Sequence, residues 1–437
     1  MLAAGKLKRN FVMLAIATIC SKCIGFLREI LSAQQFGLSN EFDIYLSVFV
    51  VPGIIISLLT YAVPNIIIPK LNRNMDDPTF YRYFASHFFT PYVLFLIFIV
   101  IVYHLFIGSY INILAFSHEQ TILALKLGRL LSIYVFFESF FNLLMTLYNS
   151  KEKFILPAFL HLTLQSSVIL FMLLFSKRVG VVSICYGLAF GAVLESLLFL
   201  VVLKKQSILK YFTFKMSYTP NLLSNIFVVL IIEALGQFYT FSDRIYVTYL
   251  PQGYITGLYY ANIVKELPFT VLGITLGGIL LPKIVRVYQN NDYIILDGLM
   301  RKILLYVFLL ASFIALFLIL GNNYIISLLF ERGAFSSNDT SLSSHLLSLF
   351  AIGLPFMFIQ FIIIKLYYTL KLERYIFYFS ILSVLLKCFF SFCFVQVGYY
   401  EGLALSTSIA YMFSASLFIV MYFIKIHPYL EGRRKIL

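Results

Sequence analysis

The run ILLYVFLLASFIALFLIL, from Ile303 to Leu320, contains eighteen residues and no charge. In a helix, eighteen residues rise about 27 Å, which is close to the thickness of the hydrocarbon layer of a bilayer. Arg301 and Lys302 stand directly before the run, where they meet the polar edge of a membrane. A stretch of this length and composition is typical of a transmembrane helix.

Similar apolar runs recur along the 437 residues, of which 61% are hydrophobic and only 12% are charged. A soluble domain carries about 25% charged residues. Helices satisfy their own backbone in lipid, and barrel strands would alternate in segments of about ten residues, which these runs do not. We therefore predict an all-α membrane protein of about twelve transmembrane helices. The predicted spans are residues 10–35, 41–68, 83–107, 120–148, 154–175, 180–203, 220–249, 254–281, 302–320, 340–369, 375–395 and 399–424.

The net charge of +14 follows the topology of these spans. With a cytoplasmic N-terminus, the cytoplasmic loops hold 22 Lys and Arg, and the outer loops hold Lys177, Arg178 and Arg332. This asymmetry is the positive-inside pattern. We expect a multi-pass protein of the bacterial inner membrane with both termini in the cytoplasm. The basic residues then contact anionic lipids, and no nucleic acid partner is needed.

An internal repeat indicates two lobes of six helices each, residues 1–215 and 216–437. The residues that match at an offset of 216 are Arg28 with Arg244, Gly37 with Gly253, Asp43 with Tyr259, and Pro52 with Pro268. Because six is even, the lobes share one orientation, and we expect a pseudo-two-fold axis along the membrane normal. Parallel repeats of this kind occur in transporters that work by rocking of the two halves.

Eight basic residues fall inside the predicted spans, and a central charge costs about 2.5–3.5 kcal/mol. They are Lys22, Arg28, Lys126, Arg129, Arg244, Lys265, Lys365 and Lys387. Most must face a wet cavity or a partner. The four in the first lobe would form a positive field suited to a diphosphate. Other interpretations stay open: Lys126 and Arg129 reach the membrane surface, and Lys365 and Lys387 join helices.

Acidic residues within the spans are candidates for balancing these charges or for carrying a coupling ion. Asp43, Glu138 and Glu233 are the main ones. We expect Na⁺, H⁺ or the membrane potential to drive such a transporter, with no other cofactor. Cys20 and Cys23 have CxxC spacing but lie in a membrane span with no second pair, so we predict no metal site.

Several motifs resemble the MurJ/MviN lipid II flippase family. SKCIGFLRE, from Ser21 to Glu29, is similar to the opening of that family, and LFERGAF, from Leu329 to Phe335, is its most specific match. The resemblance implies the fold of the multidrug/oligosaccharidyl-lipid/polysaccharide exporter superfamily, with a cationic cavity for a diphosphate-sugar headgroup. It also implies a lipid-linked glycan as substrate. The candidate substrate-binding residues are Lys22, Arg28, Asp43, Lys126, Arg129, Arg244 and Lys265.

Departures from the family pattern keep alternatives open. Ile56-Ser57 replaces an Arg-Arg pair, Ile263 replaces a cavity arginine, and the spans number about twelve, not fourteen. We expect the substrate to be lipid II or a related O-antigen or capsule repeat unit. The alternatives are an ion-coupled multidrug exporter and a membrane glycosyltransferase or ligase. The short outer loops offer few catalytic groups, so we predict a transporter, not an enzyme, and a monomer.

Overall fold

The computed structural model describes residues 20–71, 77–212, 215–217, 242–246 and 248–430. Throughout this part of the chain, all regular elements are helices and none is a strand. Nine helices of the described residues are long and apolar enough to cross a membrane, and one bent helix pair makes a tenth. The prediction of an all-α membrane protein is confirmed.

Ten of the twelve predicted spans correspond to these helical segments. Of the other two predictions, 10–35 is described from residue 20 onward and is helical over 20–36, and 220–249 falls largely outside the described residues. Several helices run further than predicted: the span predicted at 302–320 begins at Tyr293, and that predicted at 83–107 covers Asp77–Ile113. Polar residues at their ends extend these helices into the interface, which an apolar run alone does not reveal.

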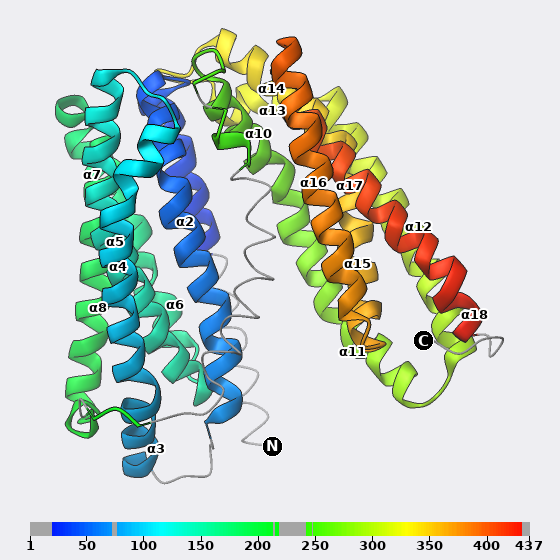
Figure 1. Ribbon diagram of the computed structural model, residues 1–437, viewed down its shortest axis with the longest axis horizontal. Coiled ribbons are helices and arrows are strands. Elements are labelled where there is room, and N and C mark those ends of the chain that lie inside the picture. Colours follow the sequence, from blue (N-terminus) through cyan, green and yellow to red (C-terminus); the bar gives the residue numbers. More distant parts are fainter. Residues whose placement is uncertain (1–19, 72–76, 213–214, 218–241, 247, 431–437) are drawn as a thin grey trace. The chain divides into compact units, whose positions relative to one another are not determined.

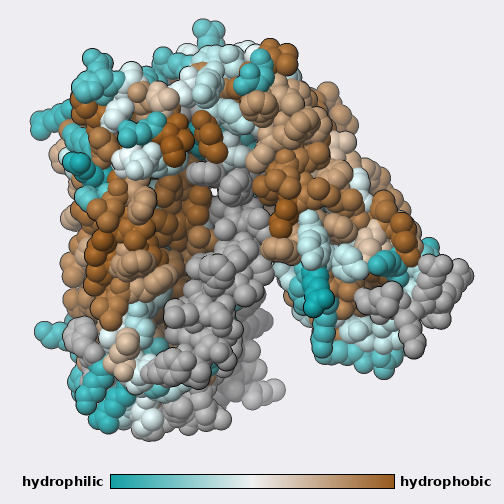
Figure 2. All heavy atoms as spheres, viewed as in Figure 1, coloured by the Kyte–Doolittle hydropathy of each residue, from teal (hydrophilic) through white to brown (hydrophobic). Residues whose placement is uncertain are grey.

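The chain forms two compact units, Met1–Gln237 and Phe238–Leu437. The predicted boundary between residues 215 and 216 lies in a partly described stretch and stays a prediction, as does the pseudo-two-fold axis. In the first unit, hydrophobic side chains cover the middle of the visible face and hydrophilic ones gather at its ends (Figure 2). This distribution matches a bilayer between two aqueous layers.

After the helix at residues 20–36, the described part of the first unit contains five longer helices and several short pieces (Figure 1). The elements are α2 (Asn40–Ile67), η1 (Ile68–Lys70), α3 (Asp77–Phe84), η2 (Ala85–Phe89), α4 (Thr90–Ile113), α5 (His118–Ser150), α6 (Ile155–Leu160), α7 (Leu162–Val179), α8 (Val182–Lys205) and η3 (Leu209–Tyr211). Helix α5 is central, because it packs against α2, α4 and α8. Ser39 and Ser117 cap α2 and α5 by accepting from backbone N–H groups.

Helices α7 and α8 pack backbone to backbone. A Cβ added to Gly187 would lie 2.6 Å from the Cα of Val168, and one on Gly191 would lie 2.9 Å from the Cα of Leu164. Only glycine permits such an approach. Small residues of this kind drive helix association in membranes, where lipid removes the hydrophobic force between helices.

The elements labelled in the described part of the second unit are nine α-helices and two short π-helical pieces (Figure 1). They are α10 (Tyr254–Pro268), η4 (Phe269–Gly273), α11 (Ile274–Gln289), α12 (Tyr293–Leu320), α13 (Asn322–Phe330), α14 (Ser337–Ile352), α15 (Leu354–Thr369), α16 (Glu373–Val397), α17 (Gly402–Met421), η5 (Tyr422–Ile426) and α18 (His427–Leu430). The main packing pairs are α10 with α14, α12 with α15, and α16 with α17.

The span predicted at 340–369 is not one straight helix. It bends by 43° between α14 and α15, at Gly353. Pro355 cannot continue the helical hydrogen bonding, and a Cβ on Gly353 would lie 2.7 Å from the Cα of Ser408. The bend therefore arises where proline breaks the helix and glycine lets α17 approach.

Candidate functional site

Arg28 is held by two polar neighbours in the first unit. Its Nε donates to Glu29 Oε1 at 3.1 Å, and its Nη1 donates to Gln165 Oε1 on α7 at 2.9 Å. A quarter of the Arg28 side chain remains exposed. Arg28 lies in the helix at residues 20–36, where Glu29 balances its charge, and its role toward a substrate stays a prediction.

Lys22, Lys126 and Arg129 are exposed and form no ion pair within the described residues. Lys126 and Arg129 share one face of α5 with the exposed Ile122 and Ile133, as their helical spacing predicts. No described carboxylate neutralises these three cations. Among the basic residues predicted inside the spans of the first unit, these three remain available to an anion.

The position of each of these cations can be measured as its distance from the end of its helix. Gln120 at the start of α5 donates to Asn40 at the start of α2 at 3.3 Å, so these ends lie at one level. At 1.5 Å per residue, Lys126 lies about 12 Å along α5 from its start, and Arg129 about 17 Å. Lys22 lies about 21 Å before the end of the preceding helix. The cations therefore lie at graded distances from these helix ends.

Asp43 is buried in the first turn of α2, with 4% of its surface exposed. Its backbone carbonyl accepts a hydrogen bond from Ser47 at 2.8 Å. A carboxylate in this position is stabilised by the N-terminal end of the helix dipole. The position of Asp43 thus has a local structural reason, and its role toward a substrate or an ion stays a prediction.

A second polar cluster joins three helices of the first unit. Glu138 on α5, Glu195 on α8 and His161 between α6 and α7 bring one ligand atom each to within 4.8 Å of the others. His161 Nδ1 and Glu195 Oε2 are 3.3 Å apart. The sequence makes Glu138 a candidate, whereas it assigns no role to His161 or Gln165. Their spacing of four, which places both on one helix face, was the signal available.

In the second unit, the basic candidates are buried and partnered. Lys265 is 3% exposed; its Nζ donates to Asn262 Oδ1 at 2.6 Å and lies 5.1 Å from the centre of the Phe350 ring. Arg244 is 5% exposed and donates to the carbonyl of Ile255 at 3.0 Å. These contacts fix local structure, and a role in substrate binding stays a prediction for both residues.

Lys387 joins two helices, as one interpretation of the sequence held. Its Nζ lies 2.6 Å from Asp243 Oδ1 and donates to Ser242 Oγ at 2.8 Å, with 1% of the side chain exposed. Asp243 therefore pairs with Lys387 across 144 residues of sequence. The third ion-coupling candidate, Glu233, lies outside the described residues.

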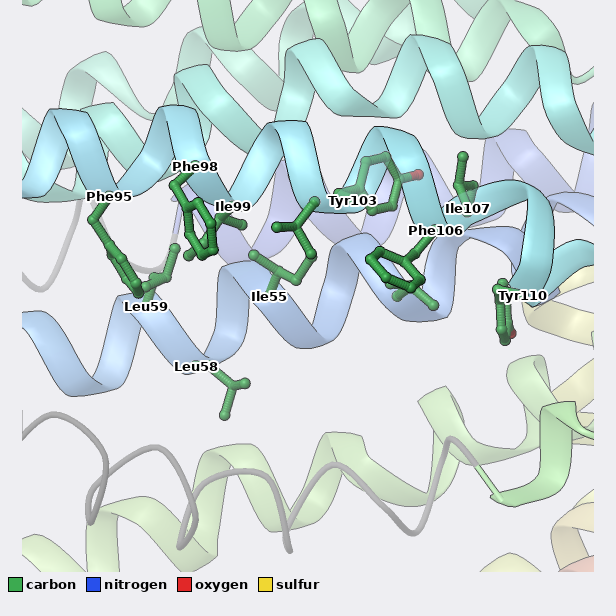
Figure 3. A pocket seen from close by; sticks show the side chains of 12 residues that line it. Ile55, Leu58, Leu59, Phe95, Phe98, Ile99, Tyr103, Phe106, Ile107 and Tyr110 are labelled. Carbon is green, nitrogen blue, oxygen red and sulfur yellow. The ribbon is translucent and has the colours of Figure 1, made fainter.

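An apolar groove of about 330 Å³ runs between α2 and α4 (Figure 3). Ile55, Leu58 and Phe98 are among its lining residues. The hydroxyls of two lining tyrosines are turned to backbone carbonyls, Tyr103 to Gly128 at 2.8 Å and Tyr110 to Ser47 at 2.9 Å. The groove presents hydrocarbon, so it suits a lipid chain and cannot hold a charged headgroup.

Comparison with known proteins gives one family. The family model described as "Lipid II flippase MurJ" matches residues 32–433. "Probable lipid II flippase MurJ" of Buchnera aphidicola is 25% identical over 418 residues, covering 92% of this chain and 80% of the relative. "Lipid II flippase MurJ" of Thermosipho africanus is 27% identical over 430 residues, covering 95% of this chain and 87% of the relative.

Solved structures show the same fold. "Lipid II flippase MurJ, inward closed conformation" matches with a TM-score of 0.78 at 24% identity, covering 97% of this chain and 90% of that chain. An inward-facing multidrug resistance MATE family transporter matches with a TM-score of 0.74 at 12% identity, covering 98% of this chain and all of that chain. Likeness at these identities shows the architecture alone.

Proposed function

Because the chain belongs to the lipid II flippase MurJ family, we propose that it moves lipid II, or a related polyprenyl-diphosphate-linked glycan, across a bacterial cytoplasmic membrane. The direction is from the cytoplasmic to the outer face, with both termini in the cytoplasm. The match to the family over nearly the whole chain carries this proposal. The protein is accordingly a membrane transporter and not an enzyme.

The headgroup of such a substrate is a diphosphate, which needs positive partners inside the membrane. Lys22, Lys126 and Arg129 are exposed and lack ion pairs among the described residues. On a lipid-facing surface each would cost about 2.5–3.5 kcal/mol. Water or an anionic headgroup removes that cost, so we assign these three side chains to the headgroup path. Arg28 contributes the exposed quarter of its side chain.

The graded depths of these cations support a stepwise path for the diphosphate. Measured from the helix ends assigned to the outside, Lys22 is the most distant of the three cations. Lys126 and Arg129 lie nearer to those ends. An anion passed from Lys22 toward Lys126 moves outward. In a cell that is negative inside, each negative charge moved outward gains about 2.3 kcal/mol per 100 mV. The membrane potential therefore favours export of the diphosphate. Coupling to Na⁺ or H⁺ would add to this driving force.

Multidrug export is the alternative function, because the MATE-like architecture is shared by drug transporters. That function favours a binding surface of acids and aromatics. The unpaired cations of the first unit favour an anionic substrate. The flippase is therefore the function that family and charge support together.

Complementation tests the proposal. A strain depleted of its own flippase should grow with the wild-type chain and fail with Lys22→Ala combined with Lys126→Ala and Arg129→Ala. Lys177→Ala with Arg178→Ala removes two exposed charges at the end of α7 and serves as the matched control. Growth of the triple variant at the wild-type rate, with equal amounts of protein in the membrane, would contradict the assigned headgroup path.

A further inference from the structure

Glu138, His161 and Glu195 form a cluster whose chemistry the flippase function does not use. Glu195 is fully buried and Glu138 is 5% exposed, while the His161 side chain is 34% exposed. The three residues come from separate helical segments of the first unit and are brought together by packing of α5, α7 and α8. The cluster therefore depends on the fold and not on proximity in sequence.

Each carboxylate presents a buried oxygen that has no protein partner. Asn142 donates to Glu138 Oε1 at 3.4 Å and to Thr60 Oγ1 at 2.9 Å, which orients one oxygen of Glu138. Glu138 Oε2 and Glu195 Oε1 have no hydrogen-bond partner among the described residues. A buried polar atom without a partner costs about 1–3 kcal/mol. A proton shared between the two carboxyl groups, or a bound cation, would satisfy these oxygens.

Three other acids among the described residues contact a cation. Glu29 contacts Arg28, Asp243 contacts Lys387 at 2.6 Å, and Asp297 contacts Arg301 at 2.7 Å. Within the described part of the chain, Glu138 and Glu195 have no Lys or Arg in ion-pair range, and their basic neighbour is His161. A neutral imidazole adds no positive charge to the cluster, so a bound cation would balance the two carboxylates in their ionised form.

We propose that Glu138, His161 and Glu195 bind one divalent transition-metal ion of the Zn²⁺ class. Two carboxylates and one divalent ion form a neutral site, whereas a sodium ion would leave one negative charge. An imidazole nitrogen is a ligand for zinc and its neighbours in the transition series, and magnesium and calcium prefer oxygen alone. Three protein ligands leave a fourth position for water.

The separations between the three ligand atoms fit this ion once the atoms move slightly closer together. Ligands at 2.0–2.1 Å on a tetrahedral ion are separated by about 3.3–3.4 Å. The 3.3 Å between His161 Nδ1 and Glu195 Oε2 already meets this value. The ligand atoms lie within 4.8 Å of one another, so the longest separation must shorten by at most about 1.5 Å.

The position of the cluster gives the ion a structural consequence. His161 lies at the break between α6 and α7, about 9 Å along the helix from Ile155, and its exposed edge gives access to the site. Phe141 stacks against the imidazole with ring centres 5.9 Å apart. A bound ion would link α5, α7 and α8 and make the first unit more rigid during transport.

Metal binding to the purified full-length protein in detergent tests the proposal. Protein freed of metal and loaded with Co²⁺ should show ligand-field absorption and bind one equivalent, and Zn²⁺ should displace it. His161→Ala and Glu195→Gln should weaken binding more than about 100-fold, because even outer-shell changes cost 10–100-fold. The controls His104→Ala and Glu119→Gln change exposed residues and should bind as wild type.

X-ray absorption spectroscopy of the zinc-loaded wild type tests the same site without any variant, so its result stands even if a variant fails to fold. It should show nitrogen and oxygen ligands at about 2.0–2.1 Å. Absence of stoichiometric binding to the wild type, or unchanged binding by folded His161→Ala, would overturn the site. These measurements involve no transport, so their failure leaves the flippase proposal standing, and a failed complementation leaves the metal site standing.

Discussion

Replacing Lys387 with Met should destabilise the second unit strongly. The Lys387 ammonium is 1% exposed and lies 2.6 Å from Asp243, whose side chain is 13% exposed. Met keeps most of the side-chain volume but leaves the aspartate without its cation. Breaking a buried ion pair from one side costs about 3–5 kcal/mol. In a unit of this size, 1 kcal/mol corresponds to about 2–4 °C, so Tm should fall by about 6–20 °C.

Thermal unfolding in detergent, followed by circular dichroism, measures this change. Lys283→Met removes an exposed lysine of α11 and should leave Tm within about 2 °C of wild type. The double variant Asp243→Asn with Lys387→Met leaves no isolated charge and should recover most of the loss. A Tm of Lys387→Met equal to that of the control, or a double variant that loses the sum of both single changes, would refute the reasoning.

Two further changes test packing and hydrogen bonding. Gly187→Ala places a Cβ 2.6 Å from the Cα of Val168 and should destabilise the α7–α8 contact by about 1–3 kcal/mol, whereas Gly108→Ala, with no atom within 4 Å, should not. Equal folded yields of both in detergent would contradict the close approach. Tyr422→Phe removes a 2.5 Å hydrogen bond to Asp297 Oδ1 and should cost about 1.5–3 kcal/mol, compared with the exposed Tyr378→Phe. An unchanged Tm for Tyr422→Phe would show that this bond contributes nothing.

Much of the fold could be predicted because a long run of apolar residues can adopt few stable structures in water or in lipid. The run from Ile303 to Leu320 has no charge to end it, so a membrane helix was the natural interpretation. The bend at Gly353 was harder to predict, because it depends on the contact with Ser408 on another helix. Helix starts such as Tyr293 also lay beyond the apolar residues that guided the prediction.

The partners of the charged residues could not be predicted from spacing. Arg28 contacts Gln165 across 137 residues, and Lys387 contacts Asp243 across 144. His161 stands between two helices and carries no motif, yet packing places it beside Glu195. Sequence indicated which side chains were costly in a membrane, but only the fold shows which of them are paired within a unit.

Reconstituted transport tests the central claim most directly. Purified protein in liposomes, supplied with a fluorescent polyprenyl-diphosphate glycan in one leaflet, should raise the rate at which the glycan becomes accessible in the other. The triple change of Lys22, Lys126 and Arg129 to Ala should return that rate to the level of protein-free liposomes. Transfer at the protein-free rate by folded wild-type protein, with a membrane potential imposed, would contradict the account.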